Sequence, residues 1–168
     1  MLKKLFILKT GYTPEDAVHA IVNTDGRVRV ADVKEIYYPY RLIKYDLSVG
    51  KEGAFSKLTK KANCIVDLVV GRPAEGRGNP KYEEIKVDEE LILEEKIDDE
   101  KARNMGYDFV LKLFLNKARL LHTPRIQVTE EKHFHKKFYI VRCLDKDDLD
   151  YFIMVDAIDG GLVILDDE

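Results

Sequence analysis

The sequence has no long apolar run. Its longest uninterrupted run, 151–155, has five residues and the run 5–8 has four, whereas a helix needs about 20 apolar residues to cross a bilayer. Lys9 ends the run 5–8 before that run reaches the roughly 7 to 15 residues of a secretory signal. We therefore expect a cytoplasmic protein with no membrane segment.

Residues of the types used in simple catalytic motifs are also scarce. Cys64 and Cys143 are the two cysteines and form no CxxC motif, which argues against a zinc knuckle or a redox pair. We expect both thiols to be buried and inert. The only serines, Ser48 and Ser56, lie outside any nucleophile elbow. No phosphate-binding or dinucleotide-binding glycine motif occurs. The sequence predicts no cofactor and favours a non-enzymatic protein.

Charge is abundant but unevenly distributed along a chain of about one domain's length. The 28 Lys and Arg residues nearly balance the 31 Asp and Glu residues. Residues 1–71 hold 12 basic and 8 acidic side chains, whereas residues 125–168 hold 6 basic and 11 acidic ones. Opposite charge at the two ends favours self-association. We expect a homo-oligomer or a protein partner.

Two helices are indicated by capping and periodicity. Thr13 as N-cap, Pro14 and two following acids predict a helix that ends at 23–26. A second helix is predicted over 98–121, where apolar residues recur at steps of three and four. Gly106 is unfavourable within it.

Most of the remaining chain has strand-like patterns. We expect strands at 28–30 and 36–47 joined as a hairpin, a loop at 48–61 and a strand at 64–70, with later strands at 126–129, 134–144, 151–155 and 162–165. Pro39 cannot donate a ladder hydrogen bond, so its strand should lie at an edge or carry a bulge. Two prolines and two glycines within 72–81 indicate a linker, and ten acids make 83–100 strongly acidic.

An internal repeat relates the two ends of the chain. A shift of 98 residues aligns 27–44 with 125–142 without a gap, with three identical and seven similar pairs among eighteen. Farther along, Asp67 and Gly71 align with Asp156 and Gly160 at a shift of 89. Two unrelated half-buried hairpins would also share apolar alternation. The repeated order nevertheless predicts an α+β fold of two duplicated helix-plus-antiparallel-sheet units packed together, at 1–71 and 98–168, separated by a linker and acidic segment at 72–97.

The end of the second unit, DYFIMVDAIDGGLVI at 150–164, resembles the closing hairpin of PepSY-like domains. The segment 139–142 is similar to the preceding strand of that family, and 13–17 is similar to the start of its helix. The resemblance implies tandem small α+β modules with binding or regulatory roles and no catalytic residue set. The chain departs from the family in lacking a signal or membrane segment.

His133 and His135 form the best candidate for a metal site. They alternate on one predicted strand, so their side chains point the same way. Lys132, Lys136 and Lys137 surround them with positive charge, which opposes a bound cation. We therefore expect a solvated strand face with no metal, although either histidine could contribute to a binding surface.

Aromatic and basic side chains are interleaved at Tyr37, Tyr38, Arg41 and Lys44. This pattern is typical of surfaces that bind single-stranded nucleic acid. The sequence pI of about 5.9 is low for such a protein, however, and nucleic acid is an unfavoured partner. The sequence thus favours a non-enzymatic binding or regulatory protein. The alternatives are an enzyme with an active site in a cleft between the units and a single-stranded nucleic-acid binder.

Overall fold

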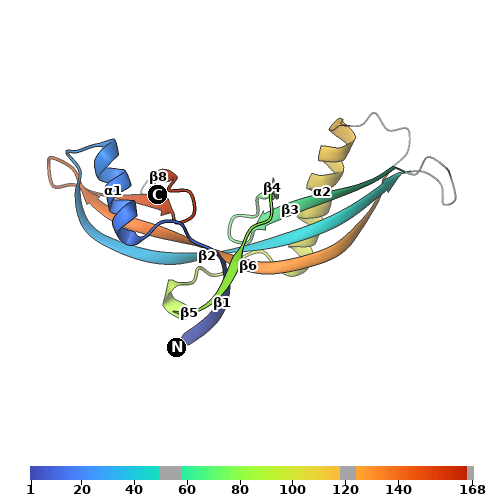
Figure 1. The fold of residues 1–168 in the computed structure, drawn as a ribbon, viewed down its shortest axis with the longest axis horizontal. Helices are drawn as coiled ribbons and strands as arrows, with labels where there is room; N and C mark the ends of the chain where they lie inside the picture. Colours follow the sequence, from blue (N-terminus) through green and yellow to red (C-terminus); the bar gives the residue numbers. More distant parts are fainter. Residues whose placement is uncertain (50–57, 118–123, 166–168) are drawn as a thin grey trace. The chain divides into compact units, whose positions relative to one another are not determined.

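A computed structural model describes residues 1–49, 58–117 and 124–165 of the chain. These residues form an α+β fold, the class predicted from the sequence, with an eight-stranded sheet and two α-helices (Figure 1). The helices are α1 (Pro14–Thr24) and α2 (Asp99–Lys117), with a 3-10 helix η1 (Glu89–Leu91). The strands are β1 (Leu2–Leu8), β2 (Arg29–Val49), β3 (Leu58–Asp67), β4 (Pro73–Glu75), β5 (Tyr82–Asp88), β6 (Arg125–Leu144), β7 (Asp150–Asp156) and β8 (Leu162–Leu165).

Two compact units are assembled from separate stretches of sequence. Unit 1 consists of Met1–Tyr38, Pro80–Leu93 and His135–Glu168, and unit 2 consists of Pro39–Asn79 and Glu94–Phe134. Strands β2 and β6 each contribute one part to each unit. Neither unit is therefore a contiguous segment of the chain.

The predicted hairpin between 28–30 and 36–47 is wrong, because this region forms the single strand β2 of 21 residues. The segments 126–129 and 134–144 likewise form the single strand β6 of 20 residues. The intervening sequences, ADVKE and EEKH, contain no glycine, proline or asparagine to turn the chain. Strand β2 lies between β3 and β6 rather than at an edge. Its pairing with β3 starts at Tyr40, one residue after Pro39, where a missing N–H is tolerated.

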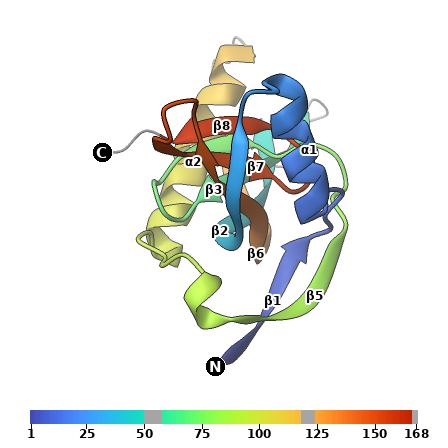
Figure 2. The ribbon, with the colours of Figure 1, turned by 90° about the vertical axis from the view of Figure 1, so that its left-hand side faces the viewer.

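Unit 1 contains α1, β1, β5, β7 and β8 (Figure 2). Helix α1 starts with the predicted N-cap: the Thr13 hydroxyl accepts a hydrogen bond from the Asp16 N–H, and the Thr13 N–H donates to the Asp16 carboxylate. Ala17 and Ile21 of α1 are buried in one core with residues of β6 and β7. Strands β1 and β5 are antiparallel and contribute to a second core.

Unit 2 contains α2, β3 and β4. Asp98 accepts a hydrogen bond from the Lys101 N–H (2.8 Å) and so caps the start of α2. The helix packs on β2 and β3 in a single core that includes Val110 and Phe114. Gly106 lies against Tyr45, whose hydroxyl donates to the Arg103 carbonyl (3.1 Å). Helix α2 therefore continues through Gly106, where the absence of a side chain leaves room for Tyr45. Of the predicted 98–121, residues 118–121 lie outside the described residues.

Two other boundary predictions need correction. The predicted loop 48–61 is too long, because β2 continues to Val49 and β3 begins at Leu58; residues 50–57 lie outside the described residues. The predicted linker 72–81 contains β4, and the acidic segment contains β5 and η1. Proline and acidic residues do not exclude strands here, because short edge strands tolerate both.

Neither helix in the described part of the chain is long and apolar enough to span a membrane.

Candidate functional site

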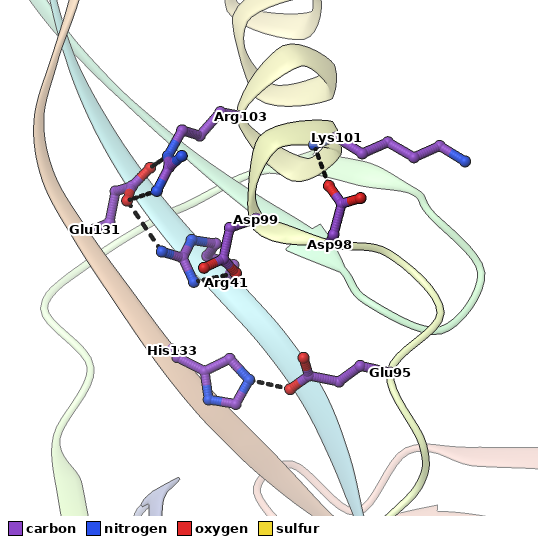
Figure 3. Close-up of polar contacts among 8 residues, drawn as sticks. All are labelled: Arg41, Glu95, Asp98, Asp99, Lys101, Arg103, Glu131 and His133. Carbon is purple, nitrogen blue, oxygen red and sulfur yellow. Dashed lines mark hydrogen bonds and ion pairs between the residues drawn. The ribbon is translucent and has the colours of Figure 1, made fainter.

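An ion-pair network in unit 2 joins α2 to the two long strands (Figure 3). Arg41 on β2 donates to Asp99 (2.9 Å) and to Glu131 on β6 (3.0 Å). Arg103 on α2 donates to both carboxylate oxygens of Glu131, at 2.5 and 3.1 Å. Two guanidinium groups thus share two carboxylates, and the network links three elements of unit 2.

The charges in this network stabilise one another. The hydrogen bond from Arg103, assisted by that from Arg41, holds the pKa of Glu131 below its usual value. The same bond raises the pKa of Arg103. Both effects favour the ionised forms, which neither donate nor accept a proton readily near neutral pH. The arrangement is suited to holding α2 in place rather than to general acid–base chemistry.

His133 in unit 2 forms a hydrogen bond through its Nε2 atom with Oε1 of Glu95 (Figure 3). Its side chain is 40% exposed, which fits the predicted solvated strand face. His135 belongs to unit 1 and is only 4% exposed. The prediction of a solvated face is therefore wrong for His135. The neighbouring Phe134 is also buried, so the strand is covered on both faces at this point, which alternation alone does not reveal.

The predicted positive field around the histidines is also weaker than the sequence suggests. In unit 1, Lys136 pairs with Asp156 (2.5 Å) and Lys137 pairs with Glu35 (2.9 Å). Glu35 lies on β2, and Asp156 lies on β7, the strand that follows β6 in the chain. Charge counting along the chain could not locate them.

The interleaved aromatic and basic residues do not form one exposed surface. Tyr37 is 2% exposed and belongs to the core of unit 1. Tyr38, also in unit 1, packs edge-on against Phe138. Arg41 and Lys44 belong to unit 2, and Lys44 pairs with Glu130 at 3.0 Å. The sequence could not show that carboxylates compensate both cations.

Both thiols are fully buried, as predicted. Cys64 is in unit 2 and Cys143 is in unit 1, each with no exposed surface. Burial raises the pKa of Cys64 to about 11 and also raises the pKa of Cys143. Because the thiolate is the reactive form, neither cysteine is suited to nucleophilic catalysis.

Strand β8 in unit 1 has three consecutive exposed apolar side chains. Leu162, Val163 and Ile164 are 36%, 53% and 65% exposed. Strand β8 pairs with β7, and among the described strands it has no other neighbour. One edge of this apolar strand is therefore open to a partner.

A groove adjoins β8 on the side that faces α1. Its volume is about 560 Å³, within the range of about 300 to 1,000 Å³ that is usual for ligand sites. Apolar residues dominate its walls: Ile21, Val28, Tyr151, Ile153, Leu162 and Ile164. Asp25 and Arg27 lie at the same groove and form an ion pair with each other (3.3 Å). The groove and the exposed side chains of β8 are called the β8 surface below.

The sequence predicts the strand at 162–165 but does not predict the β8 surface. The available signal was its composition, LVIL, which has no polar residue to mark a solvent-facing side. Such a run is usually read as a buried strand. Only the structure shows that these apolar side chains are exposed.

Searches of protein-family models, curated proteins and solved structures find no match to this chain.

Proposed function

We propose that this protein is a non-enzymatic binding or regulatory protein that takes a protein partner at the β8 surface. The observation that carries the proposal is the exposure of three consecutive apolar side chains on an open strand edge beside an apolar groove. Exposed apolar surface of this kind marks interaction sites. Soluble proteins otherwise protect such edges with charge or proline, because an open edge recruits other chains.

The alternative functions have less support from the geometry. The network of Arg41, Arg103, Asp99 and Glu131 is made of ion pairs that favour the charged forms of their members. The two thiols are buried with raised pKa values. Arg41 and Lys44, the cations that a nucleic-acid surface would need, are paired with carboxylates. These contacts favour binding of protein over catalysis or nucleic-acid binding.

The duplication predicted from the sequence is also part of this proposal, and matching strand registers support it. In β2 and β3, Tyr40 pairs with Asp67, and in β6 and β7, Phe138 pairs with Asp156. These are the positions that the shifts of 98 and 89 residues align.

The turns that follow the paired strands also match. The N–H of Gly71 donates to the Asp67 carbonyl, and the N–H of Gly160 donates to the Asp156 carbonyl. Both glycines have positive φ angles, of 84° and 74°. Positive φ is accessible to glycine at little cost, which explains why each repeat has glycine here.

Helix placement supports the duplication in an unexpected way. Each proposed repeat has a fully buried alanine one turn after its helix cap, Ala17 in α1 and Ala102 in α2. Helix α1 shares its core with β6 and β7, whereas α2 shares its core with β2 and β3. Each helix thus packs on strands of the other repeat. The resemblance to PepSY-like domains and the cytoplasmic location stay predictions.

A display selection tests the proposed function. The full chain would be immobilised and panned against a random peptide library displayed on phage. We expect enriched peptides whose binding is lost in the double variant Val163→Lys, Ile164→Lys. Both side chains are exposed, so the variant should retain the thermal unfolding profile of the wild type. No enrichment, or enriched peptides that bind the variant equally well, would contradict the proposed function.

A further inference from the structure

The sheet edge at β8 differs from its counterpart in unit 2. Strand β4 stands in the same relation to β3 as β8 does to β7: Cys64 pairs with Glu75, and Ile153 pairs with Ile164. The sequence of β4 is PAE, so proline and glutamate protect that edge against pairing. The sequence of β8 is LVIL and has no such protection. The two edges therefore differ in their protection: proline and glutamate disfavour pairing of another chain with β4, and no such residue lies in β8.

The charge around β8 indicates the sign of a partner. From residue 147 to the end of the chain the sequence has eight acidic residues and no Lys or Arg. Three of these acids, Asp148, Asp150 and Asp156, form ion pairs with basic residues of β2 and β6. Asp159, just before β8, accepts a hydrogen bond from the Gly161 N–H and forms no ion pair with any described residue. In residues 58–79, which contain β3 and β4, four basic residues outnumber two acidic ones. A carboxylate that has no ion pair among the described residues thus lies directly before β8, whereas basic residues predominate in the sequence around β4.

The same charges argue against a second copy of the chain at this edge. If two β8 strands paired antiparallel, each acidic flank would lie opposite the other, because acids both precede and follow β8 in the sequence. Like charges placed opposite each other destabilise strand pairing. A strand flanked by Lys or Arg would experience attraction instead.

We infer that β8 accepts an additional β-strand from a partner protein, an extended apolar segment flanked by basic residues. In this mode, main-chain hydrogen bonds form along the open edge, and alternate side chains of the partner lie on the two faces of the sheet. Leu162 and Ile164 present apolar contacts on the groove side, and Val163 presents one on the other face. This inference rests on the proposed function and specifies its partner.

Three labelled peptides test the inference against the full chain by fluorescence anisotropy. The first, KKVTVIVKK, is apolar and basic; the second, EEVTVIVEE, carries the opposite charge; the third, KKVPVPVKK, keeps the charge but lacks two main-chain donors. We expect the basic peptide to bind about tenfold or more tightly than the acidic one at low salt, with the difference shrinking as salt is added. The proline peptide should not bind measurably.

Substitutions on the protein locate the binding. Ile164→Lys should weaken binding of the basic peptide about tenfold or more, because a lysine both repels it and protects the edge. The matched control is Leu149→Lys, which adds the same charge at a residue equally exposed, 64% against 65%, but outside β8. It should change binding no more than about twofold by its long-range charge. Val163→Lys provides a second test should Ile164→Lys fail to fold.

The outcomes separate the inference from the proposed function. If the acidic and basic peptides bind equally and Ile164→Lys weakens both, the charge preference is wrong while the proposed function stands. If the proline peptide binds as tightly as the basic one, strand addition is wrong. Dimerisation of the chain alone, abolished by Ile164→Lys, would replace the basic partner with a second copy. Binding insensitive to Ile164→Lys would contradict both.

Discussion

At the scale of single residues, Glu131 connects the two arginines of the ion-pair network in unit 2. It accepts hydrogen bonds from both Arg41 and Arg103, and its side chain is 19% exposed. Its partners come from β2 and α2, which are distant in sequence, so the spacing of charged residues along the chain could not predict the network. Its effect on stability is open to direct measurement.

Glu131→Gln should lower the free energy of unfolding at pH 7 by about 1 to 2 kcal/mol, because it weakens charge-assisted hydrogen bonds. The pKa of Glu131 is lowered in the folded protein, chiefly by Arg103. Its stabilising effect is therefore present above the ordinary value of 4.5 and is lost as pH falls through the folded pKa. Urea unfolding at several pH values should show the two proteins converging at acid pH.

The adjacent Glu130 is the control for this measurement. It pairs with Lys44 at 3.0 Å, but its side chain is 56% exposed. Exposed ion pairs contribute about 0 to 1 kcal/mol, so Glu130→Gln should have the smaller effect. An equal loss of stability in both variants at pH 7 would show that the network around Glu131 has no special role.

At the scale of elements, the side chain of Tyr45 on β2 limits the size of the residue at position 106 inside helix α2. A Cβ atom at this position would lie 2.4 Å from the Tyr45 hydroxyl oxygen. Gly106→Ala should therefore destabilise the protein by about 1 to 3 kcal/mol through overpacking, although alanine is intrinsically the better helix former. In a Tyr45→Phe background the same change should be neutral or stabilising by up to about 1 kcal/mol. Thermal unfolding of the four proteins measures this coupling, and additive effects would contradict the explanation.

The elements also show what the sequence could predict. Helix α1 was predicted with its cap, because Thr13 and Pro14 act locally. Strands β7 and β8 were predicted from apolar runs between turn residues. The continuity of β2 and β6 was not, because half of each strand packs in a different unit and its apolar pattern changes between the two. Exposure of β8 depends on which strands pair with it, which a local pattern cannot encode.

At the scale of the whole molecule, the core of each unit combines residues that are distant in the sequence. The core of unit 1 combines Ala17 with Val141 and Val155, and the core of unit 2 combines Val66 with Val110. The proposed repeat can be predicted from the sequence, because the aligned positions have similar residue types. The packing of α1 on β6 and β7, and of α2 on β2 and β3, cannot be predicted in this way, because the apolar pattern of a helix is the same whichever strands it packs on.

The central claim is that the open edge of β8 binds a basic, extended strand of a partner protein. Hydrogen exchange of the full chain, with and without saturating KKVTVIVKK, tests this claim most directly, because strand addition protects main-chain amides. We predict slower exchange at 162–165 when the peptide is bound, with no comparable change at β4, whose edge is protected. Unchanged exchange in β8 under saturation, or protection centred on another element, would contradict the account.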